Sequence, residues 1–135
     1  MTRPIGQIGL AVKRLQVRHL RAGDTALAEL GISLVQWDAL RHIAENPGAS
    51  LHDLARLTFQ SDQAFGTLAT RMQERGFIER VAGPGRAVRL RLTPHGERLR
   101  AEAARIVEGV LAESFAPLSP AELATFDGLL RKLGL

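Results

Sequence analysis

The stretch that decides the fold runs Phe77-Ile78-Glu79-Arg80-Val81-Ala82-Gly83-Pro84-Gly85-Arg86-Ala87-Val88-Arg89-Leu90-Arg91-Leu92. Residues 88–92 alternate strictly between apolar residues and arginine, which is the period of a half-buried β-strand. Residues 77–81 form a second run of strand length before the turn at 83–86. We therefore predict a β-hairpin with Arg86 at or beside its tip. Its second strand should turn Val88, Leu90 and Leu92 toward a core and Arg89 and Arg91 toward solvent.

Three helix starts precede this hairpin. Ser33 and Gln36 have the spacing of a capping box, which predicts a helix from residue 34 to about 45. Ser50 opens a short helix, with Asp53 three residues on, and Ser61 opens another that runs through residue 75 and ends at Gly76. A short helix followed closely by a second one is typical of a helix-turn-helix, and the hairpin behind it is typical of a wing.

Apolar stripes mark the helices at both ends of the chain. Pro4 suits the first turn of a helix that extends to about residue 30. Thr93 and Pro94 open a long helix that extends to about residue 115, and Ser119 with Glu122 forms a further capping box. The stripes consist of Ile5, Ile8, Val12 and Leu15 in the first helix and of Leu123, Phe126, Leu130 and Leu133 in the last.

The composition is that of one globular domain. The chain has 135 residues, of which 45% are hydrophobic, and it has no cysteine for a disulfide or a thiolate metal site. It has no apolar run of about 20 residues and no charged start followed by an apolar stretch, so we expect a cytoplasmic protein without a membrane span. The net charge is +4, and residues 71–105 hold nine arginines against four glutamates. Such a cluster suits a phosphate backbone, although it is also compatible with a solvated surface.

Three segments carry a resemblance to a known family. They are Arg71-Met72-Gln73-Glu74-Arg75-Gly76-Phe77-Ile78-Glu79-Arg80, Leu90-Arg91-Leu92-Thr93-Pro94-His95-Gly96 and Leu118-Ser119-Pro120-Ala121-Glu122-Leu123. With this order of elements, the chain resembles the multiple-antibiotic-resistance regulator (MarR) family over nearly its whole length. The expected fold is mainly α-helical with a small β-hairpin wing, a winged helix-turn-helix with N- and C-terminal dimerisation helices. We expect a single domain, 1–135, with a DNA-binding lobe at 33–93 and dimerisation helices at 4–30 and 94–135.

The resemblance implies a homodimeric, sequence-specific transcriptional regulator, a repressor that acts on a pseudo-palindromic operator in double-stranded DNA. In this family the first and last helices form the dimer interface, so the two terminal stripes are the expected contacts. The alternative is that these stripes pack on each other within one chain. Many relatives release DNA on binding a small aromatic or phenolic effector, and candidates for lining its cleft are Arg14, His19, Trp37 and His42.

The helix from Ser61 is the one expected in the major groove. The candidate DNA-binding residues are Ser61, Gln63, Gly66, Thr67, Thr70, Arg71 and Arg86. Gln63 suits an adenine edge, the hydroxyls suit phosphates or bases, and Gly66 permits a close backbone approach. Arg86 matches the arginine that enters the minor groove in the family.

Three positions depart from the family pattern. Relatives usually carry basic residues near 62 and 67, where this chain has Asp62 and Thr67, and often an aspartate where it has Pro84. Asp62 suits the helix dipole, but it would repel phosphate or accept a hydrogen bond from cytosine. A second hypothesis is therefore a winged-helix dimer that has lost specific DNA recognition and acts as a protein-interaction module.

An enzyme is not expected. The sequence has no glycine-rich phosphate loop, no Gly-x-Ser-x-Gly and no His-Glu-x-x-His motif, and no cofactor or catalytic residue is predicted. The four histidines lack the spacing of three or four residues that would place two metal ligands on one helix face, so no metal site is predicted either.

Overall fold

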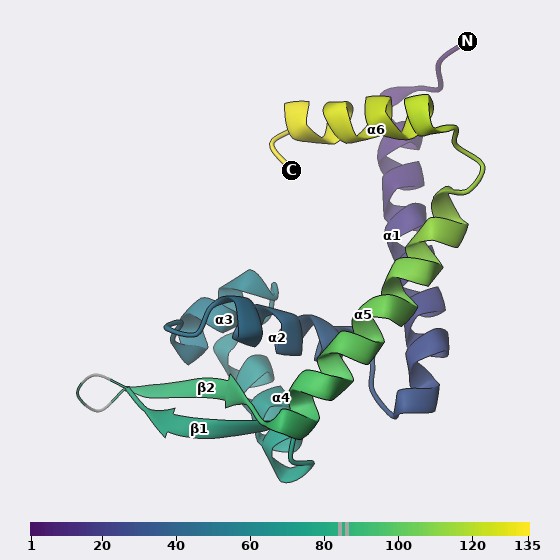
Figure 1. The fold of residues 1–135 in the computed structure, drawn as a ribbon. Coiled ribbons are helices and arrows are strands. Elements are labelled where there is room, and N and C mark those ends of the chain that lie inside the picture. The colour runs from purple at the N-terminus through teal and green to yellow at the C-terminus, as the bar shows by residue number, and fades with distance from the viewer. Residues whose placement is uncertain (84, 86) are drawn as a thin grey trace.

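The computed structural model describes residues 1–83, 85 and 87–135 as six α-helices, one 3-10 helix and one hairpin (Figure 1). In chain order they are α1 (Ile5–Leu27), η1 (Ala28–Leu30), α2 (Leu34–Glu45), α3 (Leu51–Leu57), α4 (Asp62–Glu74), β1 (Ile78–Ala82), β2 (Val88–Leu92), α5 (Pro94–Phe115) and α6 (Pro120–Lys132). The predicted order of helices and the hairpin wing is confirmed. We call α2 to β2 the lobe. The C-terminal half of α1 together with α5 is the stem, and the N-terminal half of α1 together with α6 is the tip.

Local side-chain caps begin the helices at the predicted residues. Ser33, Ser50 and Ser119 each form a complete capping box with the residue three positions on. Ser61 accepts a hydrogen bond from the backbone N–H of Ala64 at 3.1 Å and so caps α4. Gly76 follows α4 with φ of 78°, the left-handed conformation that ends a helix and that glycine adopts without strain.

The hairpin pairs Ile78 with Leu92 and Ala82 with Val88 in an antiparallel ladder. Leu90 is 3% exposed and faces the core as predicted, and Arg91 is exposed. The prediction for Val88 is wrong, because this side chain is 38% exposed. Val88 is the first residue of β2 and lies at the end of the strand beside the turn.

The core lies inside the lobe and where the stem joins it. Its largest fully buried side chains are Phe65, Leu27, Leu40, Ile43, Leu54, Met72 and Ile78. Gly96 joins α5 to the hairpin at very short range, since a Cβ at this position would lie 1.9 Å from the carbonyl oxygen of Phe77. Only glycine permits this contact.

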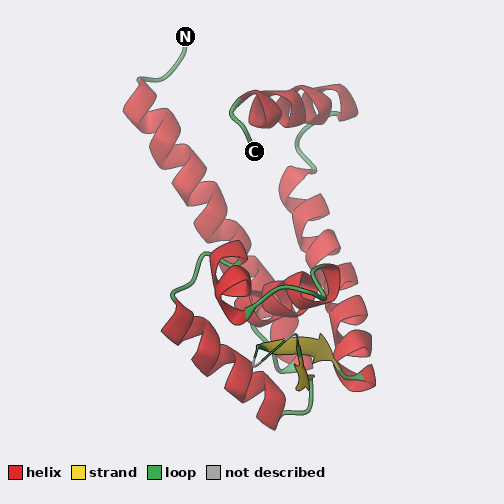
Figure 2. Ribbon diagram, turned by 90° about the vertical axis from the view of Figure 1, so that its left-hand side faces the viewer, coloured by secondary structure: helices red, strands yellow, loops and turns green. Residues whose placement is uncertain are grey.

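The tip has almost no core. In Figure 2, α1 and α5 diverge away from the lobe, and α6 lies across the far end of α5. The predicted interface residues Ile5, Ile8, Val12, Leu123 and Leu133 are 86%, 37%, 65%, 41% and 76% exposed, and Leu15, Phe126 and Leu130 are half-buried. Phe126 packs on Phe115, with ring centroids 5.8 Å apart. The two stripes therefore do not bury each other within one chain.

Within the described residues, no helix is long and apolar enough to cross a membrane.

Candidate nucleic-acid interface

The exposed face of α4 forms the floor of an open groove. The groove has a volume of about 600 Å³ and is lined by Gln63, Gly66, Thr67, Thr70, Arg71, Glu74 and Arg80. The opposite face of α4 is anchored by Phe65, Ala69 and Met72, each 1% exposed or less. This anchoring holds the polar face outward, so five of the predicted residues line one surface. Ser61 is exposed at the start of the same helix.

The hydroxyl groups on this face already have partners. Thr67 donates to the carbonyl oxygen of Gln63 at 3.1 Å, and Thr70 donates to that of Gly66 at 3.0 Å. The Ser61 oxygen serves the helix cap. Phosphate oxygens only accept hydrogen bonds, so both threonines would have to rotate before they could bind a phosphate.

Three polar side chains on the face make no internal contact among the described residues: Gln63, Arg71 and the acidic Glu74. The Gln63 amide and the Arg71 guanidinium are exposed and make no hydrogen bond or ion pair with any residue that the structure describes. A Cβ on Gly66 would have no neighbour within 4 Å, so the fold itself leaves open space at this position. Gln63 and Arg71 can therefore meet DNA without breaking an internal contact.

Sequence reasoning missed Arg80, which lies on β1 and extends the basic side of the groove. Its Nε donates to the Gln73 side chain at 2.9 Å, and this bond holds the guanidinium beside α4. The alternation of the hairpin predicts that some arginines face outward, but it does not show that one of them reaches the helix groove.

Arg75 has the structural role expected for the end of α4. Its guanidinium donates to the carbonyl oxygen of Gly31 at 2.7 Å and lies 4.6 Å from the ring centre of Phe77. The end of α4 is thereby tied to the turn that follows α1. Pro84 and Arg86 lie outside the described residues, so the expectation for the wing arginine stays a prediction.

The carboxylate of Asp62 has an unexpected partner. Both of its oxygens lie near Nδ1 of His52 on α3, at 2.9 and 3.1 Å. Sequence reasoning related Asp62 to the helix dipole or to DNA, and not to another side chain of the protein. The partner lies ten residues earlier in another helix, and no local spacing indicates this contact.

An apolar pocket of about 290 Å³ lies where the stem meets the lobe. Its walls come from α1, α2 and α5, and they include His19 and Trp37. The indole Nε1 of Trp37 is buried and has no hydrogen-bond partner among the described residues, so it is a donor that a ligand could use. His19 Nε2 and Ser114 Oγ are hydrogen-bonded at 2.7 Å, and burial, followed by the charge of Arg18, lowers the pKa of His19.

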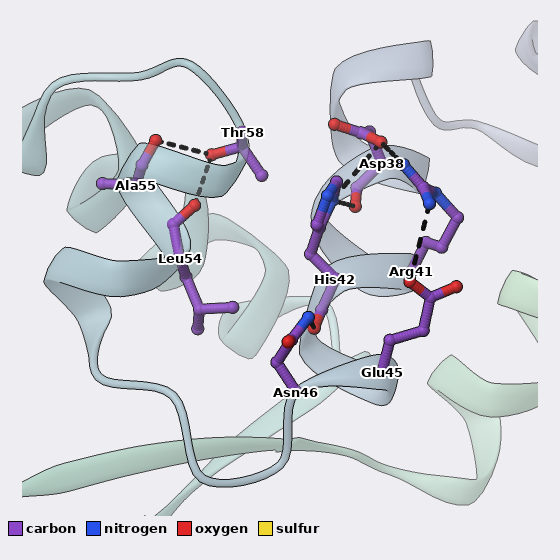
Figure 3. Close-up of polar contacts among 8 residues, drawn as sticks. All are labelled: Asp38, Arg41, His42, Glu45, Asn46, Leu54, Ala55 and Thr58. Atoms are coloured by element: carbon purple, nitrogen blue, oxygen red, sulfur yellow. Dashed lines mark hydrogen bonds and ion pairs between the residues drawn. The ribbon is translucent and has the colours of Figure 1, made fainter. Parts of the chain in front are cut away.

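The other two effector candidates lie elsewhere. His42 Nδ1 and the Asp38 carbonyl oxygen are 2.9 Å apart, and Asp38 also binds Arg41 (Figure 3). Arg14 lines a separate hollow of about 900 Å³ between α1 and α5. The same close-up shows Thr58, which also lines the smaller pocket and donates to the carbonyl oxygens of Leu54 and Ala55.

Across the part of the chain that the structure describes, no group of three or more His, Asp or Glu side chains could hold a metal ion. The groove on α4 combines Arg71 and Arg80 with the Gln63 amide and the Glu74 carboxylate, and such groups can contact phosphates and base edges.

Comparisons with known proteins agree with this geometry. Residues 30–87 match the MarR family model. The HTH-type transcriptional repressor Rv2887 of Mycobacterium tuberculosis is 32% identical over 113 residues, which cover 82% of this chain and 81% of the relative.

Two solved structures of Rv2887 have the same fold. The complex with DNA superposes with a TM-score of 0.80 at 26% identity, and covers 99% of this chain and 100% of that one. The complex with p-aminosalicylic acid superposes with a TM-score of 0.81 at 28% identity, and covers 98% and 100%. On its sequence, its winged-helix fold and these likenesses, the chain belongs to the MarR family of transcriptional regulators.

Proposed function

We propose that this protein is a cytoplasmic, homodimeric, ligand-responsive repressor that binds a pseudo-palindromic operator and is not an enzyme. The observation that carries the proposal is the exposed face of α4, where Gln63 and Arg71 line an open groove and make no internal hydrogen bond or ion pair with described residues. A helix of this kind places its N-terminal side chains against base edges in the major groove. The relative Rv2887 has been solved in complex with DNA, which supports the same use here.

The roles of the side chains follow from their chemistry. Gln63 can bind an adenine edge bidentately, and Arg71 can bind a phosphate. Ser61, Gly66, Thr67 and Thr70 complete the proposed contact surface on α4. Arg86 stays part of the proposal as a minor-groove contact, on the strength of the sequence resemblance alone.

The second copy of the chain is needed at the tip. Exposed apolar stripes on α1 and α6 would lose their contact with water in a two-fold dimer. Two copies would present two α4 helices to half-sites about 34 Å apart, one turn of the double helix. The proposed units are therefore a DNA-binding lobe at 33–93 and dimerisation helices at 4–30 and 94–135.

Fluorescence anisotropy with the DNA upstream of the protein's own gene, and with a scrambled duplex, tests DNA recognition. We expect specific binding to exceed non-specific binding by about 10³-fold or more at physiological salt. Arg71→Ala should weaken both specific and non-specific binding, and it should lower the slope of log affinity against log salt concentration by about one. Gln63→Ala should mainly reduce the ratio of specific to non-specific affinity.

A matched control for charge is Arg131→Ala, because this arginine is exposed and belongs to α6, a helix that Figure 1 shows far from α4. Unchanged affinity and salt slope in Arg71→Ala would remove α4 from the DNA contact. If a genome-wide DNA selection also recovered no operator, the protein-interaction module would replace the repressor.

The proposed effector is a small aromatic carboxylate, which would bind in the 290 Å³ pocket where stem and lobe meet. The buried Nε1 of Trp37 supplies a donor for an oxygen of the ligand, and apolar side chains supply contacts for its ring. Rv2887 has been solved with p-aminosalicylic acid, a molecule of this class.

Trp37 is the single tryptophan of the chain, so its fluorescence reports binding directly. Titration with p-aminosalicylic acid should quench this emission and release bound DNA over the same concentration range. Gly23→Ala should weaken the quenching, because its Cβ would lie 3.2 Å from the methyl groups of Leu34 on the pocket wall. DNA release without any change in Trp37 emission would place the effector elsewhere.

A further inference from the structure

The contact between His52 and Asp62 joins the two helices of the helix-turn-helix at the end that leads into the groove. His52 is the second residue of α3 and Asp62 the first residue of α4. Nδ1 of the imidazole lies 2.9 Å from one carboxylate oxygen and 3.1 Å from the other. The side chains are 62% and 69% exposed, so the pair contributes little to stability and is open to a ligand.

The other charged groups around His52 either have partners of their own or are cations, which cannot accept a hydrogen bond from the imidazole. Its neighbour Asp53 belongs to the capping box of α3, where hydrogen bonds with Ser50 lower its pKa most, with smaller effects of His52 and of Arg89 on β2. Arg56 lies one turn further along α3 and cannot accept a hydrogen bond. On α2, the charged side chains Asp38, Arg41, His42 and Glu45 pair among themselves. Asp62 is thus the carboxylate that contacts the imidazole.

The charge of this pair depends on one proton. With a neutral imidazole, the pair carries the full negative charge of Asp62, which repels phosphate at the start of α4. With a protonated imidazole, the net charge is zero and a second N–H, on Nε2, becomes available to a phosphate oxygen. Histidine is the side chain that makes this change between about pH 5 and 8.

We propose that His52 and Asp62 form a proton-controlled charge site at the DNA-facing start of α4, and that protonation of His52 strengthens DNA binding. The inference rests on the proposed DNA-binding function. It assigns a role to Asp62, the acidic residue at a position where relatives usually carry a basic one. In this role Asp62 sets the charge and holds the imidazole, and it is not a base-reading residue.

The test measures the affinity for a mixed-sequence duplex of about 30 base pairs at pH values of about 6 and about 8 and at constant ionic strength. A duplex without an operator suffices, because the effect acts on the phosphate backbone. The wild-type protein should bind about three- to tenfold more tightly at the lower pH. His95→Gln is the control, since His95 is an exposed histidine of α5 that packs on Phe77.

Three substitutions set the charge of the pair. His52→Gln should bind at both pH values as weakly as the wild type does at the higher pH. His52→Lys should bind tightly and independently of pH. Asp62→Asn should bind more tightly than the wild type at the higher pH, because it removes the repelling charge.

The outcomes separate this inference from the proposed function. If the wild type binds the duplex but His52→Gln keeps the pH ratio, the inference is wrong and DNA binding stands. If Asp62→Asn binds more weakly, Asp62 contacts DNA directly and the inference is also wrong. If the wild type binds neither this duplex nor its upstream DNA, both the inference and the proposed function fall.

Discussion

The lobe and the tip follow different rules for burying apolar side chains. In the lobe, residues such as Phe65, Leu54 and Ile43 are 2% exposed or less. At the tip, Ile5, Val12 and Leu133 are more than half exposed, and α6 has no buried residue. Both regions use the same capping boxes and the same helical periods. Local sequence signals therefore produce the helices in both regions, whereas only the lobe supplies a core for them within one chain.

In the proposed dimer, this difference makes the tip the part of the protein that depends on a second copy. The core of the lobe is already buried within one chain, so the stability of the lobe should not depend on protein concentration. The stability of the tip should depend on it, because its apolar stripes can be buried only by another chain. Substitutions in the two regions should separate these behaviours.

Gly96→Ala should have the largest effect on the lobe. Its Cβ would overlap the carbonyl oxygen of Phe77, so α5 and the hairpin would have to move apart. We expect a loss of about 3 kcal/mol or more in the free energy of unfolding. Chemical denaturation followed by circular dichroism measures it.

Gly109→Ala is the matched control on the same helix. A Cβ at Gly109 would meet nothing within 4 Å, and alanine favours the helix, so we expect a gain of about 0.5–1 kcal/mol. A clear loss at Gly109 would mean that the partner copy approaches α5 there.

Val12→Asp should break the tip and spare the lobe. Val12 is 65% exposed in one chain, so an aspartate at this position does not disturb the fold of the single chain. In the dimer, the second copy would bury this charged side chain without a partner, which is costly. We expect the dimer to dissociate at a concentration about a hundredfold higher, as measured by analytical ultracentrifugation. Ala44→Asp, on an exposed position of α2, should leave assembly unchanged. A dimer that survives Val12→Asp would place the interface away from this stripe.

The capping boxes allow one local motif to be compared in both regions. Ser50→Ala should lower the free energy of unfolding of the lobe by about 1 kcal/mol, because α3 packs into the core. Ser119→Ala removes the corresponding bond from α6, which the backbone N–H of Glu122 donates to the serine oxygen. That loss should appear as weaker dimerisation and leave the unfolding of the lobe unchanged. Equal effects on the lobe would mean that α6 folds together with it.

Acid should weaken both boxes. Hydrogen bonds with Ser50 lower the pKa of Asp53, and hydrogen bonds with Ser119 lower that of Glu122. A carboxylate with a lowered pKa stabilises the fold at neutral pH, and this contribution is lost as the pH falls below about 4 and through the pKa of the folded state. Asp53→Asn removes this titrating carboxyl group, so it should reduce the drop in melting temperature between neutral and acidic pH. An unchanged drop would show that other carboxylates cause the acid sensitivity.

Phe59→Asn should have the smallest effect, and a favourable one. Phe59 lies between α3 and α4 with φ of 57° and is 96% exposed, so it adopts a left-handed conformation without burying its ring. Asparagine tolerates this conformation better, and we expect a gain of about 0.5–1 kcal/mol in the free energy of unfolding. Thermal melting measures it. A loss would mean that the Phe59 ring makes a stabilising contact in the dimer.

The sequence predicts the helices well because their signals are local. Ser33 with Gln36 and Gly76 after α4 lie within one turn of the boundary that they determine. The contact of His52 with Asp62 and the reach of Arg80 to α4 depend on how separate elements dock, which no short spacing encodes. His19 and Trp37 were predicted to line an effector pocket, but the rest of its lining was not, because three separate helices form its walls. The bonds of the Thr67 and Thr70 hydroxyls could have been predicted, because a threonine within a helix often donates to the carbonyl four residues earlier.

The hydrogen bond from Arg75 to the Gly31 carbonyl fixes one end of α4 at the turn that follows α1. The Arg75 end is fixed at the junction with α1, and the opposite end, at Ser61, is the one that we propose meets DNA. The helix has 13 residues. Its length is therefore about 20 Å, so a rotation of about 10° at the fixed end would carry Ser61 through about 3.5 Å. That displacement is one base-pair step, about 3.4 Å along the duplex. If the whole lobe turned by this angle about the junction with the stem, the proposed DNA-contacting end of α4 would therefore move by about one base-pair step.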